Sequence, residues 1–246
     1  MSKYLTLSLL LLLCWTNLGC LGAEKNTEKE VAPKTAVQEQ VMRELPKLEV
    51  VHKPIKWTEQ REQLIKEYAQ MHYGKDITSI VPQVVITHWT ASNDAESVYQ
   101  YFYSETMPDD GGGRLNVASH YLVDRDGTIY QLTPETALNR HAIGYNWCAI
   151  GIENVGGVDG KEDLTEAQVK ANIAIIRYLQ AKYSTIKYVW GHYQQHEAES
   201  SGLFIEKVPD YYAEKIDPGS AFMGKLKQGL SDLDRKSTRL NSSHRT

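Results

Sequence analysis

A strong helix signal followed closely by a strand signal restricts the fold of this chain more than any other feature. Thr165 and Gln168 form a capping-box pattern, and apolar residues then recur at helical spacing through residues 169–179. The apolar β-type run at residues 188–190 follows. Because helix and strand signals alternate in this way along the chain, we predict an α/β fold: a single domain with a central mixed β-sheet flanked by helices.

The other predicted elements fit the same alternation. Asp126-Gly127 stands between two β-type runs within residues 119–132, which is the strongest short-range signal for a hairpin. The remaining predicted elements are a helix between Thr58 and Gly74, a buried strand at residues 84–86, a helix from Asp94 to Tyr103, and a strand at residues 149–155 that Glu153 interrupts.

Composition excludes two classes of protein. The formal net charge of −4 gives no basic excess, so we expect no nucleic-acid partner. The three cysteines are Cys14, Cys20 and Cys148, and only Cys148 lies outside the apolar leader at the start of the chain. A disulfide framework is therefore excluded. A hydrophobic content of 41% is enough for one core with appendages.

Residues 1–23 have the pattern of an export signal. Lys3 precedes a short leucine-rich stretch that is too short to span a bilayer, and small residues follow it. The sequence before Cys20 resembles a lipoprotein box, so two alternatives stay open: lipidation of Cys20, or ordinary cleavage near Ala23. We expect an exported protein, either periplasmic, an outer-membrane lipoprotein with a lipid anchor, or secreted.

Two further segments lie outside the predicted domain. Residues 24–48 are rich in Glu, Lys, Gln, Thr and Ala, which is typical of a linker. Residues 234–246 resemble the translation of a sequencing adapter and are interpreted as a non-native tail. The predicted folded domain is therefore residues 49–233.

Two apolar β-type runs end at a histidine, and a turn sequence presents a carboxylate. The histidines are His88 and His192, and the carboxylate belongs to Asp217 in an Asp-Pro-Gly turn. Two histidines and one carboxylate, with a fourth position left for water, are a recurrent ligand set for catalytic zinc. The alternatives are structural histidines and an aspartate that only forms the turn.

Five motifs occur together in an order found in one family. They are Ile86-Thr87-His88-Trp89-Thr90-Ala91-Ser92, the hairpin at residues 120–132, Ile150-Gly151-Ile152-Glu153, Gly191-His192 and Lys215-Ile216-Asp217-Pro218-Gly219. Across residues 50–226 the chain resembles the zinc-dependent N-acetylmuramoyl-L-alanine amidases of type 2, which are relatives of the peptidoglycan-recognition proteins. The resemblance implies that fold and one Zn²⁺ per chain, held by His88, His192 and Asp217.

Glu153 and Lys215 are the candidate catalytic residues. Glu153 interrupts an apolar strand, and a buried carboxylate with a raised pKa suits proton transfer near neutral pH. Lys215 stands two residues before a predicted ligand, and the resemblance implies that it stabilises the oxyanion. The alternatives are a solvated strand glutamate and a surface lysine.

Four residues are candidates for substrate binding: Trp89, His120, His141 and Asn146. The resemblance places His141 near the substrate without making it a ligand. His120 has the alternative of capping the hairpin, and Asn146 that of orienting a loop. We interpret His196 as structural or exposed, and Cys148 as a buried thiol with no nucleophilic role.

The segment between His192 and Asp217 is longer than in compact members of the family. Its part at residues 196–214 contains several apolar and aromatic side chains, so we predict that it packs beside the metal and forms a wall of the substrate groove. The alternative is that these side chains only complete the core.

The predicted function is hydrolysis of the amide bond between N-acetylmuramic acid and L-alanine in peptidoglycan or in muropeptides. The sequence itself supports zinc-assisted amide hydrolysis, and the bond is implied by the resemblance. The alternative is a non-catalytic peptidoglycan-binding module on the same fold, although such modules typically lack one or more ligands. We expect a monomer.

Overall fold

A six-stranded mixed sheet carries the candidate ligands, in the computed structural model that describes residues 45–243. Side chains are described through residue 231. The predicted export signal, Cys20 and most of the predicted linker lie outside the described residues. Leu48, the last residue of that linker, packs against the main core.

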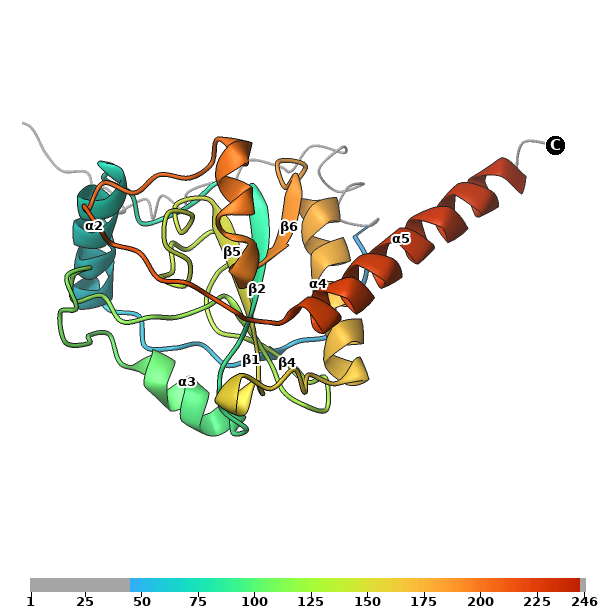
Figure 1. Cartoon of the computed structure of the whole chain (residues 1–246), viewed down its shortest axis with the longest axis horizontal. Coiled ribbons are helices and arrows are strands. Elements are labelled where there is room, and N and C mark those ends of the chain that lie inside the picture. Colours follow the sequence, from blue (N-terminus) through green and yellow to red (C-terminus); the bar gives the residue numbers. More distant parts are fainter. Residues whose placement is uncertain (1–44, 244–246) are drawn as a thin grey trace, which may run out of the picture. The chain divides into compact units, whose positions relative to one another are not determined.

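The strand order is β1-β4-β3-β5-β2-β6 (Figure 1). The strands are β1 (Val51–His52), β2 (Val84–Trp89), β3 (Tyr121–Val123), β4 (Ile129–Gln131), β5 (Ala149–Asn154) and β6 (Tyr188–Gly191). Strands β3 and β4 pair antiparallel, as the two arms of the predicted hairpin, and the other neighbouring strands of this sheet pair parallel. The prediction of a mixed sheet is confirmed.

The central strand β2 brings the site together. It runs parallel to both β5 and β6, so the carboxyl ends of the three strands meet at the same edge of the sheet. In the register of these pairs, His88 stands opposite Glu153, and Thr87 stands opposite Gly191. His192, which follows Gly191, therefore reaches the same edge as His88. Ligand sites of open parallel sheets form at such edges.

The helices begin and end where the sequence signals stand. Thr58 caps α2 through its side chain and Gly74 ends it in a left-handed conformation, while Thr165 and Gln168 form the predicted capping box of α4. The helices are α2 (Glu59–Tyr73), α3 (Ala95–Tyr103), α4 (Glu166–Lys182) and α5 (Ser220–Ser243), with short 3-10 helices η1 (Val158–Gly160), η2 (His192–Gln194) and η3 (Glu197–Ser201).

Alternate residues of the central strands face different cores. Val85 of β2 and Ile150 and Ile152 of β5 pack in the main core with apolar residues of α4 and α5. Those two helices lie together on one side of the sheet (Figure 1). Because strand side chains alternate between faces, His88 and Glu153 belong to the opposite face. The chemistry-bearing side chains are therefore on the face away from α4 and α5.

Besides the short 3-10 helices, the sequence did not predict the edge strand β1 or the C-terminal helix α5. The backbone of α5 continues into the segment interpreted as a non-native tail, up to residue 243. No helix in the described part of the chain combines the length and the apolar character that crossing a membrane requires.

Candidate active site

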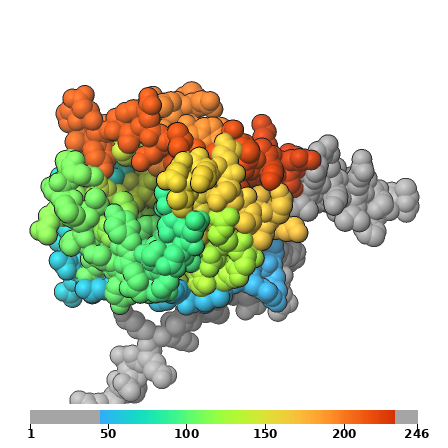
Figure 2. Space-filling view, turned by 60° about the horizontal axis from the view of Figure 1, so that its bottom comes forward, coloured from blue at the N-terminus to red at the C-terminus, as the bar shows by residue number. Residues whose placement is uncertain are grey.

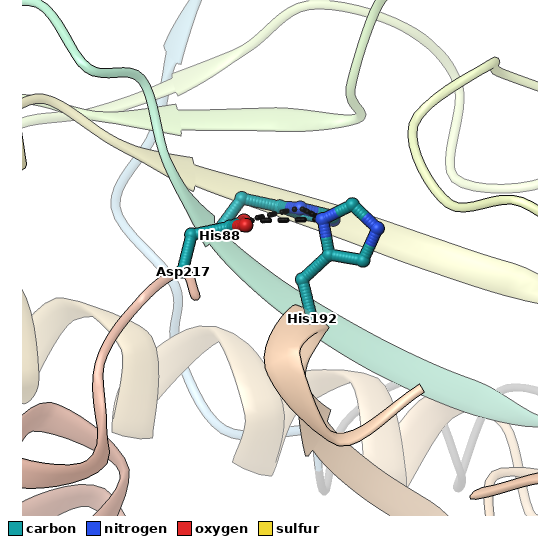
Figure 3. Close-up of side chains that lie close together, drawn as sticks. All are labelled: His88, His192 and Asp217. Carbon is teal, nitrogen blue, oxygen red and sulfur yellow. Dashed lines mark hydrogen bonds and ion pairs between the residues drawn. The ribbon is translucent and has the colours of Figure 1, made fainter. Parts of the chain in front are cut away.

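Three side chains from separate segments form a compact group of donors. His88 comes from the end of β2, His192 from the start of η2, and Asp217 from the loop before α5 (Figure 3). His88 Nδ1 lies 3.0 Å from His192 Nδ1, and each of these atoms lies 3.1 Å from Asp217 Oδ2. The structure thus brings together the three residues predicted as ligands.

This group fits a zinc ion. Donors about 2.0–2.2 Å from a tetrahedral zinc would be separated by about 3.3–3.5 Å, close to the spacing observed here. All three residues are buried: the exposed fraction is 2% for His88, 5% for His192 and 8% for Asp217. A carboxylate and two imidazoles so close together need a shared cation, which is either a proton or a metal ion.

The charges around the group favour a cation between the donors. Burial alone would raise the pKa of Asp217, but hydrogen bonds with His192 and His88 hold it far below its usual range. Burial lowers the pKa of His192 to about 4, so its imidazole is neutral at pH 7 and free to bind a metal. Burial would also lower the pKa of His88, yet the carboxylates of Glu153 and Asp217 raise it.

Glu153 is a partly buried residue, and one of its carboxylate oxygens is unsatisfied. Its Oε2 atom is shielded from solvent and has no hydrogen-bond partner among the described residues. Burial raises its pKa to about 7; the negative charge of Asp217 adds to this, whereas His88 and Lys215 oppose it. A group with this pKa exchanges protons near neutral pH, as the predicted catalytic role requires. The alternative, a solvated glutamate on the strand, does not fit an oxygen that is shielded from solvent.

The donors, Glu153 and Lys215 line a single cavity of about 310 Å³. A hollow opens on this side of the molecule in Figure 2, between the green surface that includes α3 and the orange surface of the later chain. The other lining residues come from β2, from α3 and its following loop, and from the segment before β5; they are Trp89, Ala91, Phe102, Val117, Ala118, Arg140 and His141.

Two of the four candidate substrate-binding residues reach the cavity. Trp89 and His141 are among the lining residues. The Trp89 ring lies directly over Gly157, where an added Cβ would come within 2.2 Å of it. Gly157 has a φ of +75°, so the turn and the close approach both require glycine.

His120 and Asn146 do not reach the cavity, which corrects the prediction that they contact the substrate. His120 is fully buried: its Nε2 faces the carbonyl of Ala137 at 2.9 Å, and its Nδ1 accepts from the Gly151 N–H at 2.9 Å. Both nitrogens are thus occupied by backbone groups. Asn146 is also fully buried and accepts the backbone N–H groups of His141 and Ala142. The Asn146 side chain therefore orients a loop, which was the alternative given for it from the sequence.

The segment at residues 196–214 contributes no lining residue to this cavity among the described residues. Phe204 and Leu203 pack instead in a core cluster under Tyr145, and Tyr212 is 49% exposed. Tyr211 accepts a hydrogen bond of 2.6 Å from Arg140. These contacts favour the alternative, that the segment mainly completes the core; the wall of the substrate groove stays a prediction.

Arg140 is a cavity residue that sequence reasoning missed. It is 4% exposed and holds the loop after α3 by donating to the carbonyls of Leu115 and Gly113 and to the carboxylate of Asp110. The only available signal was its position next to His141. An isolated arginine has no spacing pattern that distinguishes it from a surface residue.

The two residues predicted to be inert are placed accordingly. Cys148 is a free, buried thiol, and burial raises its pKa to about 12, so it is no nucleophile at neutral pH. His196 is exposed and pairs with Glu199.

Comparisons with known proteins point to one family. The family model described as N-acetylmuramoyl-L-alanine amidase matches residues 78–220. An endolysin of Escherichia phage T7 is 39% identical over 75 residues, which are 29% of this chain and 50% of the endolysin. An endolysin of Klebsiella phage KP32 is 33% identical over 76 residues, with the same coverage. The match thus spans about half the length of these curated relatives.

Solved structures with a similar fold include two of different origin. N-acetylmuramoyl-L-alanine amidase LysC from Clostridium intestinale is 22% identical, with 75% of this chain and 99% of that chain covered and a TM-score of 0.46. A human peptidoglycan-recognition protein in complex with a glycosamyl muramyl pentapeptide is 19% identical, with 58% and 82% covered and a TM-score of 0.40.

Proposed function

This chain belongs to the N-acetylmuramoyl-L-alanine amidase family, and from that premise we propose that it is a zinc-dependent peptidoglycan amidase. The bond cleaved would join the lactyl group of N-acetylmuramic acid to L-alanine of the stem peptide, in peptidoglycan or its fragments. The observation that carries the proposal is a buried, unpaired carboxylate oxygen of Glu153 in the same cavity as a three-donor group.

His88, His192 and Asp217 would hold the ion, one per chain. The chemistry that a zinc ion supplies when bound is a lower pKa for water and a more polarised amide carbonyl. The remaining work falls to the protein's own side chains, of which Glu153 and Lys215 line the cavity.

Glu153 acts as the proton carrier in this proposal. Its unpaired Oε2 accepts a proton from the attacking water and then delivers it to the departing nitrogen of L-alanine. A pKa of about 7 lets the same group accept and release the proton near neutral pH. Beside a bound cation this pKa would be lower, so that more of the carboxylate would be in the basic form.

Lys215 supports the negative charge that develops on the carbonyl oxygen. Lys215 is partly exposed, lines the cavity, and stands two residues before Asp217. A positive group fixed beside the reacting carbonyl stabilises the transition state more than the ground state. Trp89 and His141, on the same cavity, remain candidates for substrate contact.

The alternative function is a non-catalytic module that binds peptidoglycan. A complete donor group with an adjacent buried glutamate favours catalysis, since a binding module has no need to keep an unpaired carboxylate at the cost of stability. Export of the protein to the envelope, with or without a lipid at Cys20, is also part of the proposal and is supported by the leader pattern of residues 1–23.

Digestion of purified sacculi tests the function. We expect stem peptides with a free L-alanine amino terminus in the soluble fraction, identified by mass spectrometry, and none with the His192→Ala variant. Sedimentation of the protein with sacculi without release of peptides would instead identify a binding module. Release of shortened glycans or of cross-link fragments would show a different bond specificity and contradict the proposal.

A further inference from the structure

The ring of His141 lies against His88 on the side away from the other donors. We propose that His141 is a positioning residue, which fixes the His88 ring in the tautomer that leaves its Nδ1 atom free for the metal. The inference rests on the proposed metal site and concerns a residue outside the ligand set.

The contacts of His141 determine where its hydrogen lies. Its Nε2 atom faces the carbonyl oxygen of Ala149 at 3.3 Å, and a carbonyl only accepts, so the hydrogen is on Nε2. Its Nδ1 atom faces His88 Nε2 at 3.0 Å. Two ring nitrogens at this distance share one hydrogen. Because His141 has its own hydrogen on Nε2, its Nδ1 accepts and His88 Nε2 donates.

The consequence for His88 is a fixed tautomer. With the hydrogen on Nε2, the lone pair of Nδ1 points toward His192 Nδ1 and Asp217 Oδ2, at 3.0 and 3.1 Å. The opposite tautomer would place an N–H at the position that a metal ion needs. A hydrogen bond at the second nitrogen is the usual means by which a protein orients a ligating histidine.

The position of His141 is set without help from any ion. The backbone N–H groups of His141 and Ala142 donate to Asn146 Oδ1 at 2.9 and 2.7 Å, and the Asn146 amide donates to Tyr68 of α2 at 3.0 Å. Below the ring, Gly151 of β5 leaves the necessary space, since a Cβ there would lie 2.9 Å from His141 Cγ. The hydrogen bond between His88 Nε2 and His141 Nδ1 is therefore held in place by the folded chain itself.

A ring that only fills space at residue 141 would have different consequences. The rings of His88 and His141 meet edge to face, with centroids 5.2 Å apart. The alternative is therefore that His141 only packs against His88. Packing depends on size and shape, whereas the proposed role depends on an acceptor atom. Asparagine and leucine have similar size and branching, but only asparagine has an acceptor near the position of Nδ1.

The test compares His141→Asn with His141→Leu. The dissociation constant for Zn²⁺ is measured by competition with a chromophoric chelator on folded protein. We expect His141→Leu to weaken zinc binding about 10–100-fold, as is usual for loss of an orienting partner, and His141→Asn to retain most of the affinity. Equal losses in both variants, or unchanged affinity in His141→Leu, would overturn the inference.

A second measurement does not depend on the variants folding. In the zinc-loaded wild-type protein at neutral pH, NMR should show the hydrogen of His88 Nε2 bonded to His141 Nδ1, as a ¹⁵N–¹⁵N coupling across the hydrogen bond. A hydrogen on His88 Nε2 that shows no such coupling would overturn the inference. Because no substrate is present, the measurement decides the question even if the protein proves not to cleave peptidoglycan. Amidase activity on sacculi tests the proposed function separately.

Discussion

His88 and Glu153 stand opposite each other in the register of two parallel strands, β2 and β5. One supplies a donor atom of the proposed metal site, and the other carries the buried carboxylate of the same cavity. Backbone hydrogen bonds of the central sheet thus fix the separation of the two groups. The proposed metal ligand His88 and the proposed proton carrier Glu153 both lie on strands rather than on loops, so their positions are rigid.

Metal analysis of the purified protein checks the ligand set. We expect close to one zinc per chain in the wild type and little in His192→Ala, because only two donors would remain. His196→Ala is the matched control, since His196 is exposed and outside the donor group, and it should keep the metal. Full zinc content in His192→Ala would rule out the assignment.

Glu153→Gln separates catalysis from metal binding. The substitution keeps the size of the side chain but removes its ability to accept a proton. We expect zinc content and thermal stability to be maintained while the turnover of muropeptides falls by about 10²–10⁴. Turnover within a few-fold of wild type would show that another group moves the proton.

The raised pKa of Glu153 also predicts a pH dependence of stability in the metal-free protein. Burial raises this pKa from 4.5 to about 7, so the folded protein binds the proton more tightly than the unfolded chain does. The contribution of this group to the free energy of unfolding is therefore greatest below pH 4.5 and is lost as the pH rises to about 7.

Glu153→Gln lacks this titration and is the control for wild type. The free energy of unfolding of both metal-free proteins is measured with urea at pH 5 and at pH 8. From pH 5 to pH 8, wild type should lose stability relative to the variant by on the order of 1–3 kcal/mol. Titrations of groups that do not interact with Glu153 cancel in the comparison, and the coupled titration of His88 is part of the difference. A difference between the two proteins that does not change with pH would mean that the Glu153 pKa is not raised.

Lys215→Met should impair turnover without releasing the metal. The substitution keeps the aliphatic chain and removes the charge, so we expect a fall in kcat of about 10²–10³ with zinc retained. Lys207→Met, in the same connecting segment but outside the cavity, is the matched control. If both variants keep full activity, Lys215 is only a surface residue.

The segment at residues 196–214 should affect stability more than catalysis. Phe204 packs against Tyr145, with ring centroids 5.6 Å apart, so Phe204→Ala should destabilise the fold by about 2–4 kcal/mol. Tyr212→Ala, at a 49% exposed position, should change stability by less than about 1 kcal/mol. We expect KM for muropeptides to stay unchanged in both, and a raised KM in either would support the groove-wall hypothesis.

Those parts of the site that stand at element ends could be predicted from sequence. His88 and His192 end apolar β-type runs, and Asp217 stands in a recognisable turn, so their local patterns already show that they reach an edge of the sheet. Their grouping followed from their composition as a ligand set and from the resemblance. Glu153 was detectable because a charge in an apolar strand requires a reason.

The roles of His120 and Asn146 could not be read in the same way. His120 is held by the carbonyl of Ala137 and the N–H of Gly151, and Asn146 by backbone groups on the neighbouring turn. Backbone partners leave no trace in residue identity. The apolar side chains of the 196–214 segment likewise gave the correct expectation of burial, but residue type does not state which cluster receives them.

The origin of the third donor has a mechanical consequence. His88 and His192 belong to the sheet edge, whereas Asp217 lies in the loop that leads to α5, where its carbonyl accepts a hydrogen bond of 2.9 Å from the Tyr193 N–H. An ion shared by all three would act as a crosslink that closes a long loop of chain, as a disulfide does in other proteins. Occupancy should therefore protect the junction before α5 from proteolysis, and a chelator should expose it.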